Sequence, residues 1–353
     1  MSNKNIEILD CTIRDGSYIV DGQWSPEEIG QITAKLAENK IAYIEVGSGI
    51  GLGATRKNVN SLCSDLEHIC AAVPVKLNSK IGAFFIPGIG SMEDLEMLAE
   101  NGGDFVRIGT DFSRYQEAIK YIEYAKKLGL EVGYNCMKSY VASPYSIGKI
   151  AVEFEKYGVA SFSLVDSAGG MLPQEVAKYI EVLVGSLSIK VGFHGHNNLL
   201  LANANALAAA NSGATIIDTT LMGMGRGAGN AQTESMSVIL RKAGYKIDAD
   251  PLELSRLSAE YISPKSSEIR GVDELQLTLG YAQFHDSYIN AIKEIASNNF
   301  IDYRLLIMEV SKINKENPST ELMTKVAKDL KQGAKTDVFY PKFHPKNKRY
   351  GTS

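Results

Sequence analysis

The first apolar segment of the chain, 6-IEILDCTIRDG-16, leads from a β-strand pattern directly into an arginine and an aspartate. Ionised side chains beside a buried strand are costly unless another group uses their charge. Arg14 and Asp15 therefore make the end of the first predicted strand, residues 6–13, a candidate site.

Similar segments recur along the chain, and each is followed by a stretch with helical periodicity. The predicted strands span residues 6–13, 42–47, 81–86, 104–109, 130–135, 160–166, 189–194 and 215–220. Apolar strands that alternate with helices indicate a parallel sheet covered by helices. Eight such units favour an α/β fold, a closed (β/α)8 TIM barrel, over an open doubly wound sheet.

The pattern changes near residue 250, so we expect a catalytic barrel over residues 1–250 and a helical C-terminal domain over residues 251–335. Helical periodicity without strands predicts helices at residues 251–261, 282–298, 301–313 and 320–332. Residues 336–353 contain two prolines and no periodicity, which is typical of a partly ordered tail.

The composition excludes several classes of protein. Hydrophobic residues make up 44% and charged residues 22%, and the net charge is -4, which argues against nucleic acid or a membrane as partner. No apolar run approaches the roughly 18 residues that span a bilayer, and no signal sequence is recognisable at the N-terminus. The four cysteines show no zinc or disulfide spacing, so we expect a cytoplasmic protein.

His194 and His196 stand at alternate positions at the end of the seventh predicted strand. Alternate strand residues point to the same side, so both imidazoles can reach one metal ion, although chance or core histidines would give the same pattern. Asp15, from a strand close by in a closed barrel, would complete a set of two histidines and one carboxylate. Such a set leaves coordination positions open for a chelating substrate and suits Mn²⁺, Mg²⁺, Fe²⁺ or Co²⁺ better than structural zinc.

Two further features belong to the same end of the barrel. Arg14 would place a cation beside the metal, where it stabilises a developing oxyanion; a structural ion pair with Glu45 or Asp166 is the alternative. The segment 223-GMGRGAGN-230 lacks the lysine of a phosphate-binding P-loop. Its glycines would instead allow the backbone to approach the metal site, with Asn230 reaching in.

Together, the motifs 12-TIRDG-16, 193-FHGHNN-198 and 223-GMGRGAGNAQTE-234 resemble those of the DRE-TIM-type, HMG-CoA lyase-like superfamily of metal-dependent aldolases and lyases. The resemblance is greatest to the 4-hydroxy-2-oxovalerate aldolases and covers about residues 7–310. It implies Asp15, His194 and His196 as ligands of Mn²⁺ (or Mg²⁺ or Co²⁺), with Asn230 beside the metal or ligating it.

The resemblance also implies the reaction. A divalent-metal-dependent aldolase, a carbon–carbon lyase of the class II pyruvate aldolase type, would cleave a 4-hydroxy-2-oxo acid to pyruvate and an aldehyde, or catalyse the reverse addition. Arg14 would bind the keto oxygen and Ser167 the substrate carboxylate. The C-terminal helices would dock an acylating aldehyde dehydrogenase, or join two copies of the chain as a homodimer.

The sequence departs from these aldolases at two positions. Tyr18 stands where they carry a histidine taken as the catalytic base, and His285 stands where they carry a tyrosine. If the two roles are exchanged, His285 is the better base at neutral pH, because an unperturbed imidazole has a pKa near 6.5 and a phenol one near 10. Two alternatives remain open: a Claisen-type acyl-CoA/2-oxo acid synthase of the same superfamily, and a catalytically altered barrel that serves as a binding or channelling subunit.

Overall fold

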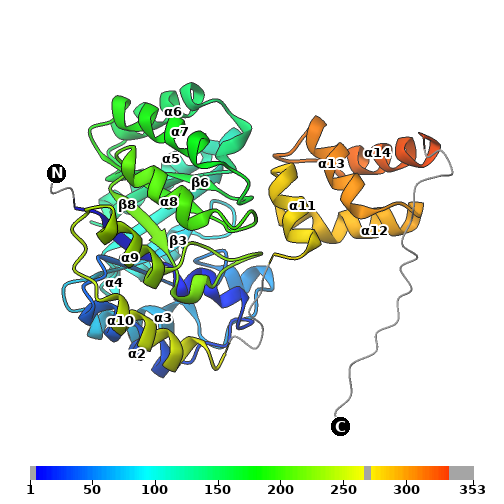
Figure 1. Cartoon of the computed structure of the whole chain (residues 1–353). Coiled ribbons are helices and arrows are strands. Elements are labelled where there is room, and N and C mark those ends of the chain that lie inside the picture. Colours follow the sequence, from blue (N-terminus) through cyan, green and yellow to red (C-terminus); the bar gives the residue numbers. More distant parts are fainter. Residues whose placement is uncertain (1–4, 266–271, 334–353) are drawn as a thin grey trace, which may run out of the picture. The chain divides into compact units, whose positions relative to one another are not determined.

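The computed structural model describes residues 5–265 and 272–333, and a closed barrel of eight parallel strands forms its centre (Figure 1). The strands are β1 (Glu7–Asp10), β2 (Tyr43–Val46), β3 (Lys80–Phe85), β4 (Phe105–Asp111), β5 (Glu131–Met137), β6 (Ser161–Asp166), β7 (Lys190–Gly195) and β8 (Ile216–Thr219). Each strand pairs with the next in sequence, and β8 pairs in parallel with β1. The predicted (β/α)8 barrel is therefore confirmed, and the open sheet is excluded.

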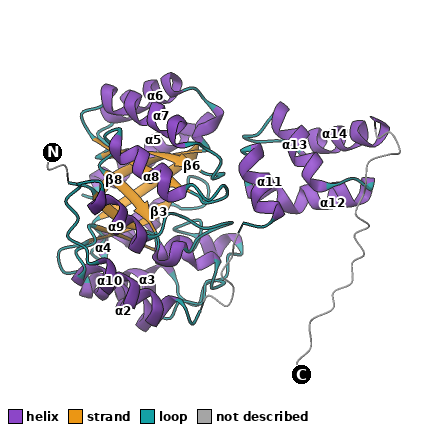
Figure 2. Ribbon diagram, viewed as in Figure 1, coloured by secondary structure: helices purple, strands orange, loops and turns teal. Residues whose placement is uncertain are grey.

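Helices cover the outside of the barrel (Figure 2). They are α2 (Pro26–Glu38), α3 (Asp65–Ala72), α4 (Met92–Glu100), α5 (Ile119–Lys127), α6 (Pro144–Lys156), α7 (Pro173–Ser186), α8 (Ala202–Asn211) and α9 (Thr233–Lys242). Local sequence sets where they begin: Ser25 caps α2 by accepting a hydrogen bond from the Glu28 amide, and Pro26 occupies the first turn.

The first strand is shorter than predicted. It ends at Asp10, and Thr12–Asp15 form one turn of helix, α1, instead of continuing the strand. The Thr12 amide donates a hydrogen bond to the Asp10 carboxylate at 2.9 Å. This bond replaces the one that the amide would donate to a neighbouring strand if β1 continued. This turn places Arg14 and Asp15 at the C-terminal end of the barrel.

The remaining helices follow the barrel in sequence. They are α10 (Pro251–Leu257), continued by the π-helical turn Ser258–Ile262, then α11 (Glu274–Ala282), α12 (Ile289–Asn299), α13 (Tyr303–Ile313) and α14 (Thr320–Gly333). The helix predicted at residues 282–298 begins only at Ile289, because Gln283 adopts a left-handed conformation (φ 49°) that ends α11. The predicted tail, residues 336–353, lies outside the described residues.

The chain separates into two compact units, Met1–Asp286 and Ser287–Ser353. This division differs from the predicted one at residue 250, because α10 packs on α9 and belongs with the barrel. In the second unit, α12, α13 and α14 pack on one another and bury Ile292, Leu306 and Ala327. Among the described residues, none of the helices has the length and apolarity that crossing a membrane requires.

Candidate metal centre

Asp15, His194 and His196 converge at the C-terminal end of the barrel. One ligand atom from each lies within 4.8 Å of the ligand atoms of the other two, and all three residues are buried. His194 belongs to β7 and His196 follows it, while Asp15 comes from the turn after β1. Because β8 lies between β7 and β1 in the closed barrel, the ends of β1 and β7 come close together. The three residues that the sequence predicts as metal ligands are therefore neighbours in the structure.

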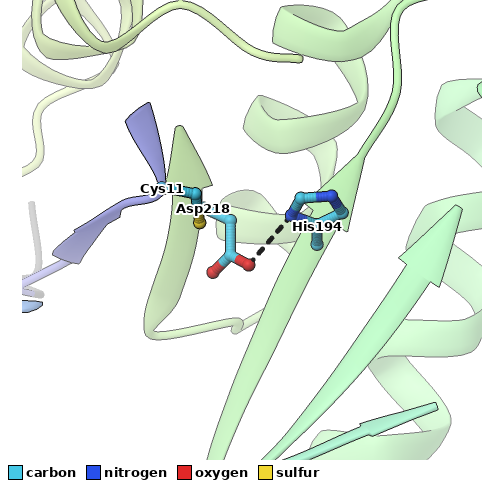
Figure 3. Close-up of side chains that lie close together, drawn as sticks. All are labelled: Cys11, His194 and Asp218. Carbon is cyan, nitrogen blue, oxygen red and sulfur yellow. Dashed lines mark hydrogen bonds and ion pairs between the residues drawn. The ribbon is translucent and has the colours of Figure 1, made fainter. Parts of the chain in front are cut away.

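Both imidazoles are held by a partner on one ring nitrogen. His194 Nδ1 lies 3.0 Å from Asp218 Oδ2, and His196 Nδ1 lies 3.3 Å from the carbonyl oxygen of Gly229 (Figure 3 shows the first contact). An N–H that donates to these oxygens leaves Nε2 of each ring with its lone pair. Histidines that ligate metals are oriented by the same kind of contact.

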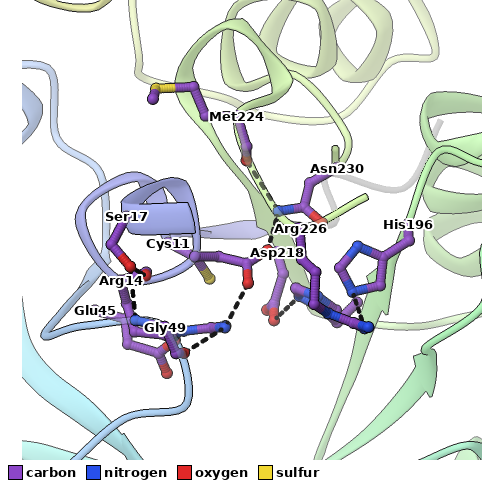
Figure 4. Close-up of polar contacts among 12 residues, drawn as sticks. Cys11, Arg14, Ser17, Glu45, Gly49, His196, Asp218, Met224, Arg226 and Asn230 are labelled. Carbon is purple, nitrogen blue, oxygen red and sulfur yellow. Dashed lines mark hydrogen bonds and ion pairs between the residues drawn. The ribbon is translucent and has the colours of Figure 1, made fainter. Parts of the chain in front are cut away.

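Asn230 completes the polar set. Its Nδ2 donates to Asp15 Oδ2 and, at 3.1 Å, to the carbonyl oxygen of Met224 (Figure 4 shows the contact with Met224). Its Oδ1 is buried without a hydrogen-bond partner. A Cβ atom on Gly225 would lie 2.3 Å from Asn230 Nδ2 and 2.8 Å from Asp15 Oδ2. Only glycine fits there, which agrees with the predicted close approach of the 223–230 segment.

This donor set fits a divalent cation. It offers a carboxylate oxygen, two imidazole nitrogens and an unpaired amide oxygen, a mixture that suits Mn²⁺ or a similar ion. Burial opposes ionisation of Asp15, but the Arg14 guanidinium, together with the hydrogen bond from Asn230, outweighs it and holds the pKa of the carboxyl below its usual range. Burial and the Arg226 guanidinium hold the pKa of His196 well below its ordinary value, which keeps the ring neutral.

Cys11, His194 and Asp218 form a second cluster whose ligand atoms lie equally close (Figure 3). Its sulfur is less suited to a metal, because burial raises the pKa of the Cys11 thiol well above the ordinary value. Arg107 also donates to Cys11 Sγ at 3.3 Å and forms an ion pair with Asp218. We therefore assign Asp218 to the support of His194.

Arg14 takes part in a network of buried ion pairs. Its Nη1 lies 2.8 Å from Asp15 Oδ1, and its Nε lies 2.7 Å from Glu45 Oε1. Glu45 Oε2 in turn lies 2.6 Å from Arg107 Nε, and Arg107 pairs with Asp218. The structural alternative for Arg14, a pair with Glu45, is thus present, and it orients the guanidinium beside Asp15.

Three further residues that the sequence predicts to act on the substrate, Ser167, Tyr18 and His285, lie around this centre. Ser167 directly follows β6, is buried, and accepts a hydrogen bond from the Lys138 amide at 2.9 Å through its hydroxyl. Tyr18 ends the short 3-10 turn Gly16–Tyr18, and its ring packs against Gly49. His285 follows α11, and its Nδ1 lies 3.4 Å from Asp286 Oδ1.

The surroundings of the two candidate bases, Tyr18 and His285, shift their pKa values in opposite directions. Burial raises the pKa of Tyr18 to about 12, so the phenol stays protonated at neutral pH. Burial, together with the Arg226 and Lys138 cations, holds the pKa of His285 well below its ordinary value, so the imidazole is neutral.

Sequence reasoning missed Arg226. Its Nη2 lies 3.2 Å from His196 Nε2 and 3.2 Å from the carbonyl oxygen of Ser167, and its Nη1 forms an ion pair with Asp286 (Figure 4 shows the contact with His196). A signal was available, since Arg226 is the only charged residue in the glycine-rich segment 223–230 at the active end of a barrel.

The sequence profile of the HMGL-like family matches residues 5–260. The chain is 36% identical to the 4-hydroxy-2-oxovalerate aldolase of Carboxydothermus hydrogenoformans, over 94% of this chain and 99% of that protein. It is 34% identical to the enzyme of the same name from Moorella thermoacetica, over 94% of this chain and 98% of that protein.

A solved structure agrees on the fold alone. The carboxyl transferase domain from Rhizobium etli pyruvate carboxylase superposes with a TM-score of 0.77 at 16% identity, over 94% of this chain and 61% of that one. The resemblance stated from the sequence motifs is confirmed by the aldolases above, as is the predicted enzyme class, a carbon–carbon lyase of the aldolase type. With its barrel, its triad and its relatives in agreement, the chain belongs to the HMGL-like family.

Proposed function

We propose that this chain is a divalent-metal-dependent aldolase that cleaves a 4-hydroxy-2-oxo acid into pyruvate and an aldehyde, or joins them in the reverse direction. The observation that carries the proposal is the convergence of Asp15, His194 and His196 beside a buried arginine. The name that the two bacterial relatives share, 4-hydroxy-2-oxovalerate aldolase, supports 4-hydroxy-2-oxovalerate or a close analogue as the substrate.

In this proposal Asp15, His194 and His196 hold the metal, and Asn230 adds its unpaired Oδ1. We propose Mn²⁺, with Mg²⁺ or Co²⁺ as substitutes. When bound, such an ion supplies a Lewis acid that stabilises negative charge on the substrate's C2 oxygen.

Arg14 is proposed to donate a hydrogen bond to the same C2 oxygen. Its Nε and one Nη1 contact are taken up by Glu45 and Asp15, so its direction is fixed before substrate arrives. Preorganised donors of this kind stabilise an enolate without reorganisation during the reaction. Ser167, at the end of β6, is proposed to bind the substrate carboxylate.

His285 is proposed as the base that accepts the proton of the C4 hydroxyl, with Tyr18 as a hydrogen-bond donor in the same site. The neutral imidazole can accept a proton at pH 7, whereas the Tyr18 phenol, with a pKa raised to about 12 by burial, cannot serve as base. Replacing His285 by Ala is expected to lower kcat for cleavage by about 10²–10⁴-fold, the usual contribution of a positioned base. Tyr18→Phe, the matched control, is expected to lower it less; the opposite ranking would transfer the role to Tyr18.

The direct test is a panel of aldehydes incubated with pyruvate, Mn²⁺ and the purified protein, with 4-hydroxy-2-oxo acid formation measured by chromatography. Product that requires Mn²⁺ and disappears in His194→Ala supports the proposal, while His68→Ala, a buried histidine bonded to the Ser64 carbonyl at 2.9 Å, controls for histidine loss. Product only from acetyl-CoA and a 2-oxo acid would establish the Claisen-type synthase. Failure to bind Mn²⁺ would favour a binding or channelling subunit.

The predicted partners and location extend the same proposal. An acylating aldehyde dehydrogenase would consume a reactive aldehyde product, and the C-terminal helices α12–α14 are the proposed surface for it or for a homodimer. Size-exclusion chromatography with light scattering, alone and with such a dehydrogenase, distinguishes the two. A cytoplasmic location stays a prediction, checked by fractionating cells that produce the protein.

A further inference from the structure

Arg226 joins three parts of the candidate site. Its guanidinium contacts His196 Nε2 and the Ser167 carbonyl oxygen, each at 3.2 Å, and forms an ion pair with the Asp286 carboxylate. The side chain is 19% exposed, so it points into the protein and not away from it. Figure 4 shows it lying beside the His196 ring.

The contact with His196 lies on the side of the ring that faces the metal site, because Nδ1 of that ring faces the Gly229 carbonyl. The contact with Asp286 lies next to His285, whose Nδ1 is 3.4 Å from the same carboxylate oxygen. Arg226 therefore spans the distance between the ligand triad and the proposed base. A substrate that reached from the triad to His285 would therefore lie beside the guanidinium.

We propose that Arg226 is a further catalytic residue, whose guanidinium donates a hydrogen bond to the C4 oxygen of the 4-hydroxy-2-oxo acid. This inference rests on the proposed function and assigns a group to the aldehyde half of the reaction. Arg14 then serves the oxygen of the pyruvate half, and Arg226 serves the oxygen that becomes the aldehyde carbonyl.

In the cleavage direction His285 takes the proton from the C4 hydroxyl, and the O–H electron pair forms the C=O bond of the aldehyde. The C3–C4 bond breaks, its electrons form the C2=C3 bond of the pyruvate enolate, and the C2 carbonyl pair moves to the C2 oxygen. The enolate then takes the proton back at C3 and becomes pyruvate. Negative charge passes through the C4 oxygen, where a guanidinium lowers the barrier.

The charges around Arg226 agree with this role. After burial, its guanidinium is the largest influence on the pKa of Tyr18 and of His285, and it lowers both. It therefore favours the unprotonated base and any oxyanion formed between these residues. Asp286 fixes the direction of the guanidinium, and the Ser167 carbonyl takes a second N–H.

Two reactions separate this role from a structural one. Aldol cleavage needs a donor at the C4 oxygen, whereas decarboxylation of oxaloacetate gives the same pyruvate enolate by losing CO2 and has no C4 hydroxyl. Arg226→Met is expected to lower kcat for cleavage about 10²-fold, the usual effect of removing one oxyanion donor, while decarboxylation stays within about threefold of wild type. Arg226→Lys, which keeps the charge, is expected to recover part of the lost rate.

Arg56→Met is the matched control, since Arg56 also pairs with an aspartate, Asp94, and a backbone carbonyl, that of Ile89, but touches none of the triad. Mn²⁺ binding, followed by calorimetry, should be retained or strengthened in Arg226→Met, because a cation beside the site is removed.

Equal loss of both reactions in Arg226→Met and Arg226→Lys, or loss of Mn²⁺ binding, would overturn the inference and leave the proposed function standing. A wild-type protein that binds Mn²⁺ but cleaves no 4-hydroxy-2-oxo acid would overturn the proposed function, and this inference with it.

Discussion

Two groups of ion pairs flank the triad, and they differ in depth. The inner network, Arg14–Glu45–Arg107–Asp218, lies on strands or the first turn after β1, and its side chains are at most 9% exposed. In the outer pair, Arg226 comes from the loop after β8 and Asp286 begins the short 3-10 turn Asp286–Tyr288; the two side chains are 19% and 26% exposed. The inner network orients Arg14, Asp15 and His194, whereas the outer pair is partly exposed to water.

Glu45→Gln should give the largest effect on the inner network. It removes the carboxylate that pairs with both Arg14 and Arg107 and leaves two buried guanidinium groups under-compensated. Breaking a buried pair in this way costs about 3–5 kcal/mol. Urea denaturation measures the loss in free energy of unfolding, and a loss below 1 kcal/mol would remove the energetic distinction between the inner and outer groups.

Asp10 sharpens the comparison, because it is buried like Glu45 but is hydrogen-bonded to two threonines, Thr12 and Thr233, instead of being paired with an arginine in the described part of the chain. Burial raises its pKa from 3.8 to about 6, although hydrogen bonds from Thr12 and Thr233 oppose the rise. The folded state therefore holds the proton more tightly than the unfolded state. Its contribution to stability is complete below pH 4 and is lost as the pH rises through about 6.

The lost contribution is about 3 kcal/mol for a shift of this size. Asp10→Asn, which cannot ionise, should show a flatter dependence of unfolding free energy on pH between 4 and 6 than the wild type. Denaturant titrations at several pH values measure this. An unchanged slope in the variant would mean that Asp10 does not titrate in this range.

Asp218→Asn tests the link from the inner network to the proposed metal site. The change weakens the contact that orients His194 at 3.0 Å, and loss of such support usually lowers metal affinity about 10–100-fold. Calorimetric titration with Mn²⁺ measures it. Asp104→Asn is the control, because Asp104 pairs with Lys76 at 2.7 Å and contacts none of the ligands; equal affinities in both variants would rule out the support role.

Asp286→Asn should give the smallest effect on stability. Its pair with Arg226 is partly exposed, and such pairs contribute no more than about 1 kcal/mol to folding. Thermal unfolding followed by circular dichroism measures the change. If Asp286→Asn lost as much stability as Glu45→Gln, the outer pair would stabilise the barrel as strongly as the inner network does.

The site was less predictable than the barrel, and Asp15 and Arg226 show why. Asp15 was nominated because it follows an apolar strand, yet the strand was expected to continue to residue 13 and in fact ends at Asp10. The hydrogen bond from the Thr12 amide to the Asp10 carboxylate, which ends the strand, depends on the side-chain rotamer of Asp10. The periodicity of the sequence carries no information about that rotamer. Arg226 was passed over because the conformation of a glycine-rich loop decides where its side chain points.

The sequence by itself determined the number and order of the strands, the capped helices between them, and the pairing of His194 with His196 at alternate positions. These features follow from local periodicity and capping, which neighbouring residues carry. Only the tertiary structure decided that Asp15 meets both histidines, that Asp218 and Gly229 orient their rings, and that Arg226 reaches His196. Those contacts join residues far apart in the chain. Pairing of β7 with β8 brings the histidines to Asp218 and to the segment after β8, and closure of β8 onto β1 adds Asp15.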